Sequence, residues 1–121
     1  MTLIHTSSFR AFRPEFGLPV VTSLGLPKWL PEAQDWPRCW LITPTAQLFR
    51  EPDPDAFAAG YRARLERFGV PRIARTLERI AADHDAGTLV LLCHEADWEQ
   101  CHRLSFATWW MSTGELVTEI S

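Results

Sequence analysis

Two segments of the chain carry hydrophobic residues with the period of an α-helix. The first segment is preceded by Asp53-Pro54 and followed by Gly69, which are typical helix start and stop residues. The second is predicted to start at Pro71 and to end within residues 83–87. The two apolar stripes are formed by Phe57, Tyr61, Leu65 and Phe68, and by Ile73, Ala74, Leu77, Ile80 and Ala81.

A buried strand and a third helix are predicted further along the chain. Residues 88–93 show no polar alternation after Thr88, which indicates a strand covered on both faces. Residues 101–113 predict a helix, and residues 116–120 a last strand. The apolar side of that helix is predicted to contain Leu104, Ala107, Trp110 and Met111.

The first part of the chain is rich in proline, which excludes long helices because each proline removes an amide donor and clashes with the preceding turn. Short strands are predicted there instead, over residues 3–7, 20–23 and 40–43. The order of strands and helices predicts one α/β domain over residues 1–121. We expect a single open, mostly parallel sheet flanked by helices, in a Rossmann-like three-layer arrangement.

Composition supports a globular domain and limits its expected partners and cellular location. The chain has 121 residues, of which 46% are hydrophobic and 22% charged, with a net charge of -3. This charge argues against attraction of the whole molecule to nucleic acid or anionic lipid. Three irregularly spaced cysteines suggest no disulfide framework and favour a cytoplasmic location. The longest apolar run, residues 89–93, is far too short to span a membrane.

Arginine is concentrated in residues 61–80, where six arginines stand against two glutamates. Two interpretations remain open for this segment. Its arginines either cover solvated helix faces or bind an anionic ligand or nucleic acid.

A cluster of chemically reactive residues follows the predicted buried strand, in Cys93-His94-Glu95 and Cys101-His102-Arg103. Open parallel sheets bind ligands beyond the carboxyl ends of their strands. One hypothesis is an enzyme in which Cys93 or Cys101 is the nucleophile and His94 or His102 transfers protons, while Glu95 orients a histidine and Arg103 binds an anion. Nine residues separate Cys93 from Arg103, which excludes a phosphatase loop with its five.

Two other interpretations of the cluster compete with the enzyme. Zinc could use the two cysteines with His94, His102 or His5, but structural zinc sites usually contain close cysteine pairs, so we expect no metal. The cluster could also be structural, with Cys93 as a small buried hydrophobe. The density of reactive residues favours the enzyme. Trp98 lies inside the candidate loop, whereas the other tryptophans are expected to fill the core.

The segment Leu91-Leu92-Cys93-His94-Glu95, followed by Cys101-His102-Arg103, resembles the signature of the domain-of-unknown-function family 488. Residues 6–9, residues 23–29 and Tyr61-Arg62 are similar to other parts of that family. The resemblance implies an α/β fold with a site built from Cys93, Glu95, Cys101, His102 and Arg103, and with the Ser7 and Lys28 loops alongside. It implies no particular reaction or cofactor.

Our leading hypothesis is a small enzyme that acts on an anionic substrate, such as a nucleotide, a nucleic acid end or a phosphorylated metabolite. Cys93, Glu95, Cys101 and His102 are the predicted catalytic residues. The predicted substrate-binding residues are Arg103, Ser7, Lys28, Trp98 and Tyr61. The alternative is a noncatalytic module that binds nucleic acid or a protein through residues 61–80, with Arg62, Arg67 and Arg75 as its main contacts.

Overall fold

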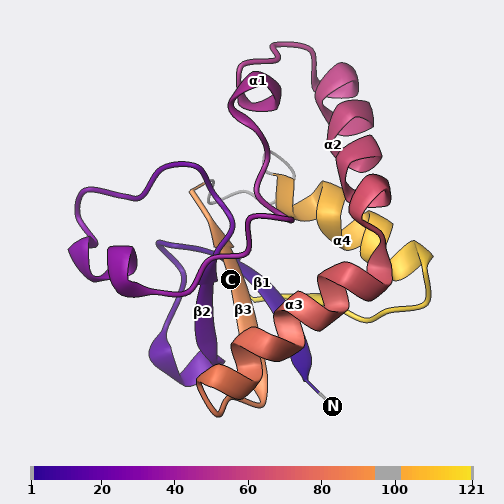
Figure 1. The fold of residues 1–121 in the computed structure, drawn as a ribbon. Coiled ribbons are helices and arrows are strands. Elements are labelled where there is room, and N and C mark those ends of the chain that lie inside the picture. Colours follow the sequence, from indigo (N-terminus) through magenta and orange to yellow (C-terminus); the bar gives the residue numbers. More distant parts are fainter. Residues whose placement is uncertain (1, 95–101, 121) are drawn as a thin grey trace.

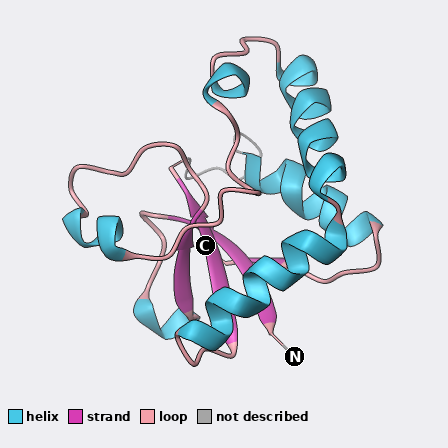
Figure 2. Ribbon diagram, in the orientation of Figure 1, coloured by secondary structure: helices cyan, strands magenta, loops and turns pink. Residues whose placement is uncertain are grey.

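A four-stranded parallel sheet forms the centre of the molecule (Figures 1 and 2). The structure is a computed structural model that describes residues 2–94 and 102–120. The strands are β1 (Leu3–Ser8), β2 (Leu18–Val21), β3 (Thr88–Cys93) and β4 (Thr118–Glu119), in the order β2-β3-β1-β4. The predicted open parallel sheet is therefore confirmed.

Strand β3 is one of the two inner strands of the sheet. It pairs in parallel with β1 on one side and with β2 on the other. All of its side chains after Thr88 are buried. Leu89 and Leu91 face one hydrophobic cluster, and Val90 and Leu92 face another. This arrangement explains the lack of polar alternation, because neither face of the strand meets water.

Different kinds of element cover the two faces of the sheet. Helices α2 (Pro54–Phe68), α3 (Val70–Asp83) and α4 (His102–Ser112) contribute buried residues to the cluster around Leu89 and Leu91. The opposite face is covered by loops and by two short 3-10 helices, Pro14–Phe16 and Pro31–Asp35. The three predicted layers are present, and the proline-rich segment supplies one of them without any long helix.

The boundaries of α2 follow from its capping residues. The Asp53 side chain accepts a hydrogen bond of 3.1 Å from the Asp55 backbone N–H, and Pro54 occupies the first turn. Gly69 ends the helix with φ of +83°, a conformation that favours glycine. Helix α3 follows directly at Val70, one residue before the predicted start.

The strand predicted over residues 40–43 is wrong. The Thr43 N–H donates to the Trp40 carbonyl at 3.2 Å, and the Thr43 hydroxyl donates to the Cys39 carbonyl at 2.8 Å. These local bonds form a turn that leaves Ile42 buried and Trp40 exposed. A short helix not predicted from the sequence, α1 (Ala46–Phe49), follows it and is capped by the Thr45 side chain.

Helix α4 is buried on a broader face than predicted. Ala107 and Trp110 are buried as expected, but Met111 is 44% exposed. The other buried residues of this helix are Arg103, Phe106 and Trp109. Within residues 2–94 and 102–120, no helix combines the length and the apolar composition needed to cross a membrane.

Candidate functional site

A cavity of about 690 Å³ lies beyond the carboxyl ends of β2 and β3. Ser23 and Cys93 line it where the two strands end, and His102 and Ser105 line it from the first turn of α4. The lining is completed, among the described residues, by Leu24, Gly25, Pro44, Phe49, Glu51, Pro52, Pro54, Phe57, Ala58 and His94. The site therefore occupies the position at which open parallel sheets bind ligands.

The chemistry of the lining is mainly apolar. Phe49, Phe57 and several prolines supply hydrocarbon surface, while the polar groups come from two serines and two imidazoles. Glu51 is the one carboxylate among the described lining residues, and no described arginine or lysine lines the cavity. The volume and the mixture of apolar walls with a few polar groups suit a small organic ligand.

Hydrogen bonds fix the orientation of His102 in the cavity wall. Its Nε2 lies 3.3 Å from the Thr22 hydroxyl oxygen, and that hydroxyl donates to the Leu92 carbonyl at 2.9 Å. Because the Thr22 proton is committed to Leu92, the Thr22 oxygen accepts from the Nε2–H of His102. In this arrangement Nε2 of the neutral ring carries a proton.

His102 is neutral at physiological pH. Its pKa is lowered to about 4, mainly by burial and also by the charge of Arg103, although a hydrogen bond with the Thr22 backbone acts in the opposite direction. The edge of the ring packs against Tyr61, with ring centroids 5.6 Å apart. A neutral, oriented imidazole can therefore exchange hydrogen bonds with a ligand without bringing a charge into the cavity.

His94 and Cys93 come from the end of β3. His94 is exposed, and its Nε2 lies 2.9 Å from the Gly25 carbonyl, to which it donates. Cys93 is buried, and its sulfur takes part in a disulfide bond. The irregular cysteine spacing had not indicated any pairing. Cys39 is a buried free cysteine outside the cavity lining, and burial raises its pKa.

Arg103 and Ser7 lie in a second polar cluster, next to β4 rather than at the cavity. Arg103 is 2% exposed, and its guanidinium lies 3.4 Å from the Glu119 carboxylate. Glu119 also accepts a hydrogen bond of 2.6 Å from Thr6. The Ser7 hydroxyl donates to the Ile120 carbonyl. Neither Arg103 nor Ser7 lines the cavity.

Burial dominates the electrostatics of Glu119. It raises the pKa of this carboxyl, although the hydrogen bond from Thr6 and the charge of Arg103 act in the opposite direction. The ion pair therefore does not offset the cost of removing this carboxylate from water.

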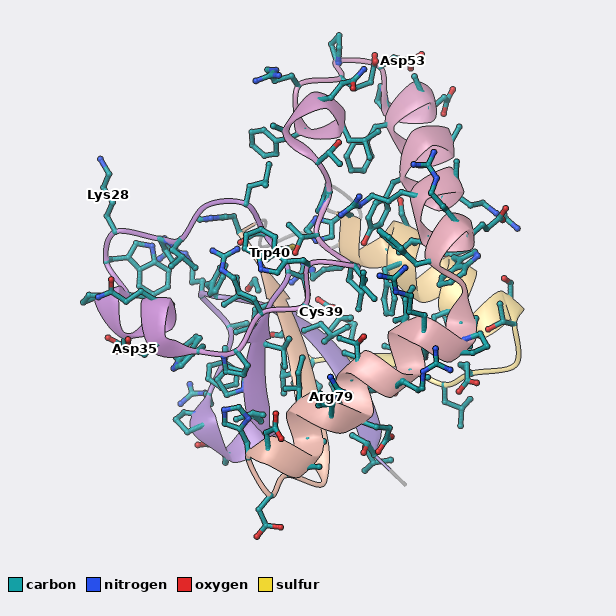
Figure 3. The ribbon with its side chains drawn as sticks, viewed as in Figure 1. Lys28, Asp35, Cys39, Trp40, Asp53 and Arg79 are labelled. Atoms are coloured by element: carbon teal, nitrogen blue, oxygen red, sulfur yellow. The ribbon has the colours of Figure 1, made fainter. Side chains whose placement is uncertain are left out.

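Two further residues predicted to bind substrate also lie outside the cavity lining. Tyr61 is fully buried, and its hydroxyl donates to the Ile42 carbonyl. Lys28 is exposed and extends away from the rest of the molecule (Figure 3). Glu95, Trp98 and Cys101 lie outside the described residues.

Several residues of the cavity were not predicted as site residues. Ser105 follows His102 by three positions on α4, so helical spacing alone places both on one side. Ser23 comes two residues after the end of β2, and thus marks a second strand end at the same edge. Phe57 is predicted from the sequence as part of the apolar stripe of α2. It also lines the cavity, which the sequence could not show because this contact depends on how α2 packs.

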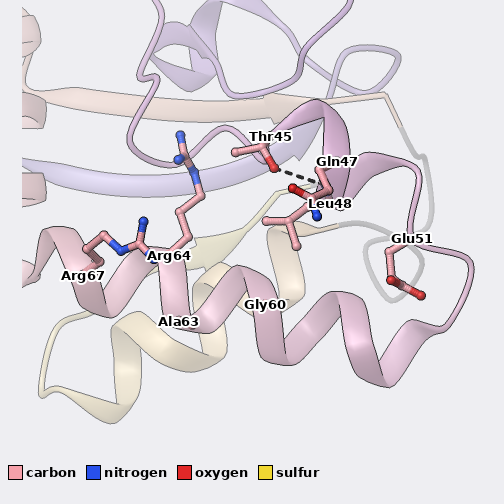
Figure 4. A pocket seen from close by; sticks show the side chains of 8 residues that line it. All are labelled: Thr45, Gln47, Leu48, Glu51, Gly60, Ala63, Arg64 and Arg67. Atoms are coloured by element: carbon pink, nitrogen blue, oxygen red, sulfur yellow. Dashed lines mark hydrogen bonds between the residues drawn. The ribbon is translucent and has the colours of Figure 1, made fainter.

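A smaller cavity of about 290 Å³ lies between α1 and α2 (Figure 4). Arg64 and Arg67 rise from one side of α2 beside it, with Thr45 and Leu48 across from them. The Arg64 guanidinium donates to the Thr43 carbonyl at 3.1 Å and to the Trp40 carbonyl at 2.9 Å. This arginine thus ties α2 to the turn that precedes α1. Across the described part of the chain, no three His, Cys, Asp or Glu side chains are grouped as metal ligands would be.

Comparison with known proteins identifies the family. A family model described as "Domain of unknown function DUF488" matches residues 26–110, which is more than half of the chain. No curated protein matches the chain, and no solved structure does. The family resemblance indicated by the sequence is confirmed, and the chain belongs to the DUF488 family of domains of unknown function.

Proposed function

We propose that this protein is a small enzyme that acts on a nucleotide-like substrate in the cavity beyond β2 and β3. The observation that carries the proposal is the meeting of Cys93, His94 and His102 in one cavity of about 690 Å³ at the sheet edge. A cavity of this size accommodates a nucleotide-sized molecule. The sheet edge is also where parallel α/β folds usually place their ligands.

The lining of the cavity offers groups that suit both the base and the phosphate of a nucleotide. A planar base would pack against Phe49, Phe57 and the neighbouring prolines, which supply the apolar surface. The phosphate would lie at the amino end of α4, where Ser105 supplies a hydroxyl and the helix dipole favours negative charge. Arg103 would hold α4 in position through its contact with Glu119 rather than touch the substrate, because it is buried and does not line the cavity.

Substrate charge would control the protonation of His102. This imidazole is neutral, with a pKa of about 4. An anionic group bound beside it would stabilise the imidazolium and raise that pKa toward neutrality. The histidine would then hold a proton that it can transfer to the substrate as a general acid. Cys93 could act as a nucleophile only after an external dithiol reductant has exchanged with its disulfide, which leaves two cysteine thiols in the protein and a disulfide in the reductant.

Binding of nucleotides to the purified protein tests the proposal. We expect a nucleoside monophosphate to bind more tightly than the matching nucleoside, and to bind more tightly at pH 5.5 than at pH 7.5, because proton uptake by His102 accompanies anion binding. Isothermal titration in two buffers of different ionisation enthalpy measures that uptake. His102→Gln should remove the pH dependence and weaken binding by about tenfold.

A matched pair of helix-surface variants supplies the control. Ala58 and Ala59 are both exposed on α2, but only Ala58 lines the cavity. Ala58→Phe should therefore block the nucleotide, whereas Ala59→Phe should leave binding unchanged. The proposal fails if no nucleotide binds, or if the two phenylalanine variants bind equally well.

A further inference from the structure

Arginine and aromatic side chains alternate along one part of the surface. They come from the segment before α1 and from helices α2 and α3, and are therefore far apart in sequence. We call this set the Arg-aromatic strip, and it consists of Arg38, Trp40, Arg64, Phe68 and Arg72.

Direct contacts join each member of the strip to the next. The Arg38 guanidinium carbon lies 4.6 Å from the centre of the Trp40 ring. The Trp40 carbonyl accepts a hydrogen bond of 2.9 Å from Arg64. Arg64 and Arg72 both stack on Phe68, at 5.0 Å and 5.2 Å from its ring centre. These contacts hold long side chains in place, which lowers the entropy lost when a ligand binds them.

The strip keeps its positive charge and an exposed aromatic side chain. In residues 2–94 and 102–120, ion pairs join Arg62 to Glu66 and Arg103 to Glu119, and none involves the arginines of the strip. Trp40 is 56% exposed, although large rings are normally buried. The strip therefore combines unneutralised guanidinium groups with an accessible indole.

We propose that the Arg-aromatic strip binds single-stranded nucleic acid, with bases stacked on Trp40 and phosphates bound by the neighbouring arginines. A single strand offers both unstacked bases and closely spaced phosphates, so it satisfies both kinds of group at once. A duplex keeps its bases stacked inside, and an acidic peptide offers carboxylates without flat rings. Both would leave the exposed indole without a partner.

The strip differs from the nucleic-acid surface that the sequence indicated. Arg62 is ion-paired with Glu66 at 2.8 Å, whereas Arg38 and Trp40 lie outside residues 61–80. Arg38 also donates to the carbonyl of Ser23, a cavity residue, at 2.9 Å. The strip thus begins beside the cavity, but its binding of a strand does not depend on nucleotide binding there.

Fluorescence anisotropy with a labelled oligothymidylate of about 20 nucleotides tests this proposal at low salt. We expect the oligonucleotide to bind more tightly than a duplex of the same length. Trp40→Ala should weaken binding by about tenfold through the loss of stacking. Arg72→Ala should weaken it and reduce the slope of log K against log salt by about 0.7, because one phosphate contact is lost.

Two residues with the same chemistry outside the strip serve as controls. Trp29 is 55% exposed and stacks with Arg10 at 5.4 Å, and Arg62 is an exposed arginine of α2. Trp29→Ala and Arg62→Ala should leave binding within a factor of two. Circular dichroism should verify that all four variants remain folded. The proposal is overturned if the oligonucleotide does not bind, if the duplex binds equally well, or if the control variants lose as much affinity as the strip variants.

Discussion

His102 and Arg103 are neighbours in sequence, yet they belong to different parts of the molecule. His102 lines the cavity, donates to Thr22 and is neutral. Arg103 is almost fully buried and pairs with Glu119 on β4. Successive residues of an α-helix point about 100° apart, which is enough to separate the two side chains. A short motif can therefore combine one residue that meets the ligand with another that fixes the helix.

Removing Arg103 should have the largest effect on stability. Arg103→Ala deletes a large buried side chain together with the packing contacts that it makes. We expect the free energy of unfolding to fall by about 3–5 kcal/mol, measured by urea denaturation. Unchanged stability with lost ligand binding would instead assign Arg103 to the ligand.

Acid should reveal the neutral state of His102. Its folded-state pKa of about 4 lies below the ordinary value of 6.5. Between these two pH values, the unfolded chain therefore binds a proton at His102 that the native protein does not bind. The free energy of unfolding should therefore decrease as pH falls from 6.5 to 4, by at most about 3 kcal/mol. Urea denaturation at several pH values measures this slope. His102→Gln should lose that part of the slope, and an identical slope in the variant would contradict the buried neutral histidine.

Thr22 tests the hydrogen bond that orients His102. Thr22→Val keeps the shape of the side chain but removes the hydroxyl that accepts from Nε2. The Leu92 carbonyl keeps the bond from the Thr22 backbone N–H, so we expect a loss of only about 1 kcal/mol. Nitrogen NMR of the imidazole should show that the preference for the Nε2–H tautomer weakens. A tautomer ratio like that of the wild type would show that other contacts orient the ring.

Glu119 should give the smallest effect, in contrast to its partner Arg103. Burial raises the pKa of Glu119 despite the ion pair, so the charge itself contributes little net stability. Glu119→Gln keeps a side-chain oxygen that can accept from Thr6 and should change the free energy of unfolding by less than about 1 kcal/mol. Thermal unfolding compares the two variants directly. A loss as large as that of Arg103→Ala would mean that the charge pair, rather than the packing of the arginine, stabilises this region.

The elements best predicted from the sequence are those fixed by local chemistry. Helix α2 is defined by Asp53, Pro54 and Gly69, and β3 by an uninterrupted apolar run. Residues 40–43 looked like a strand, but turn hydrogen bonds to Cys39 and Trp40 prevail there. Whether such a segment forms a turn or a strand depends on whether the folded protein places a neighbouring strand beside it. The composition of the segment therefore could not distinguish the two.

The sequence predicted the position of the candidate site correctly, but only some of the residues that line it. Cys93 and His102 line the cavity because one ends a strand and the other begins a helix. The orientation of Arg103 toward β4 depends on the packing of a two-residue edge strand, which leaves little pattern in the sequence. The Arg-aromatic strip joins three distant segments, so its continuity appears only in the folded chain.

The position of β3 between β1 and β2 also has a consequence for protein synthesis. The strands on either side of it, β1 and β2, lie within the first 21 residues, whereas β3 begins at Thr88. A growing polypeptide therefore carries these two strands without their shared pairing partner until most of this sequence has left the ribosome. The β1-β3 and β2-β3 pairings must wait for that late segment and close long loops, which favours slow folding and gives chaperones time to act.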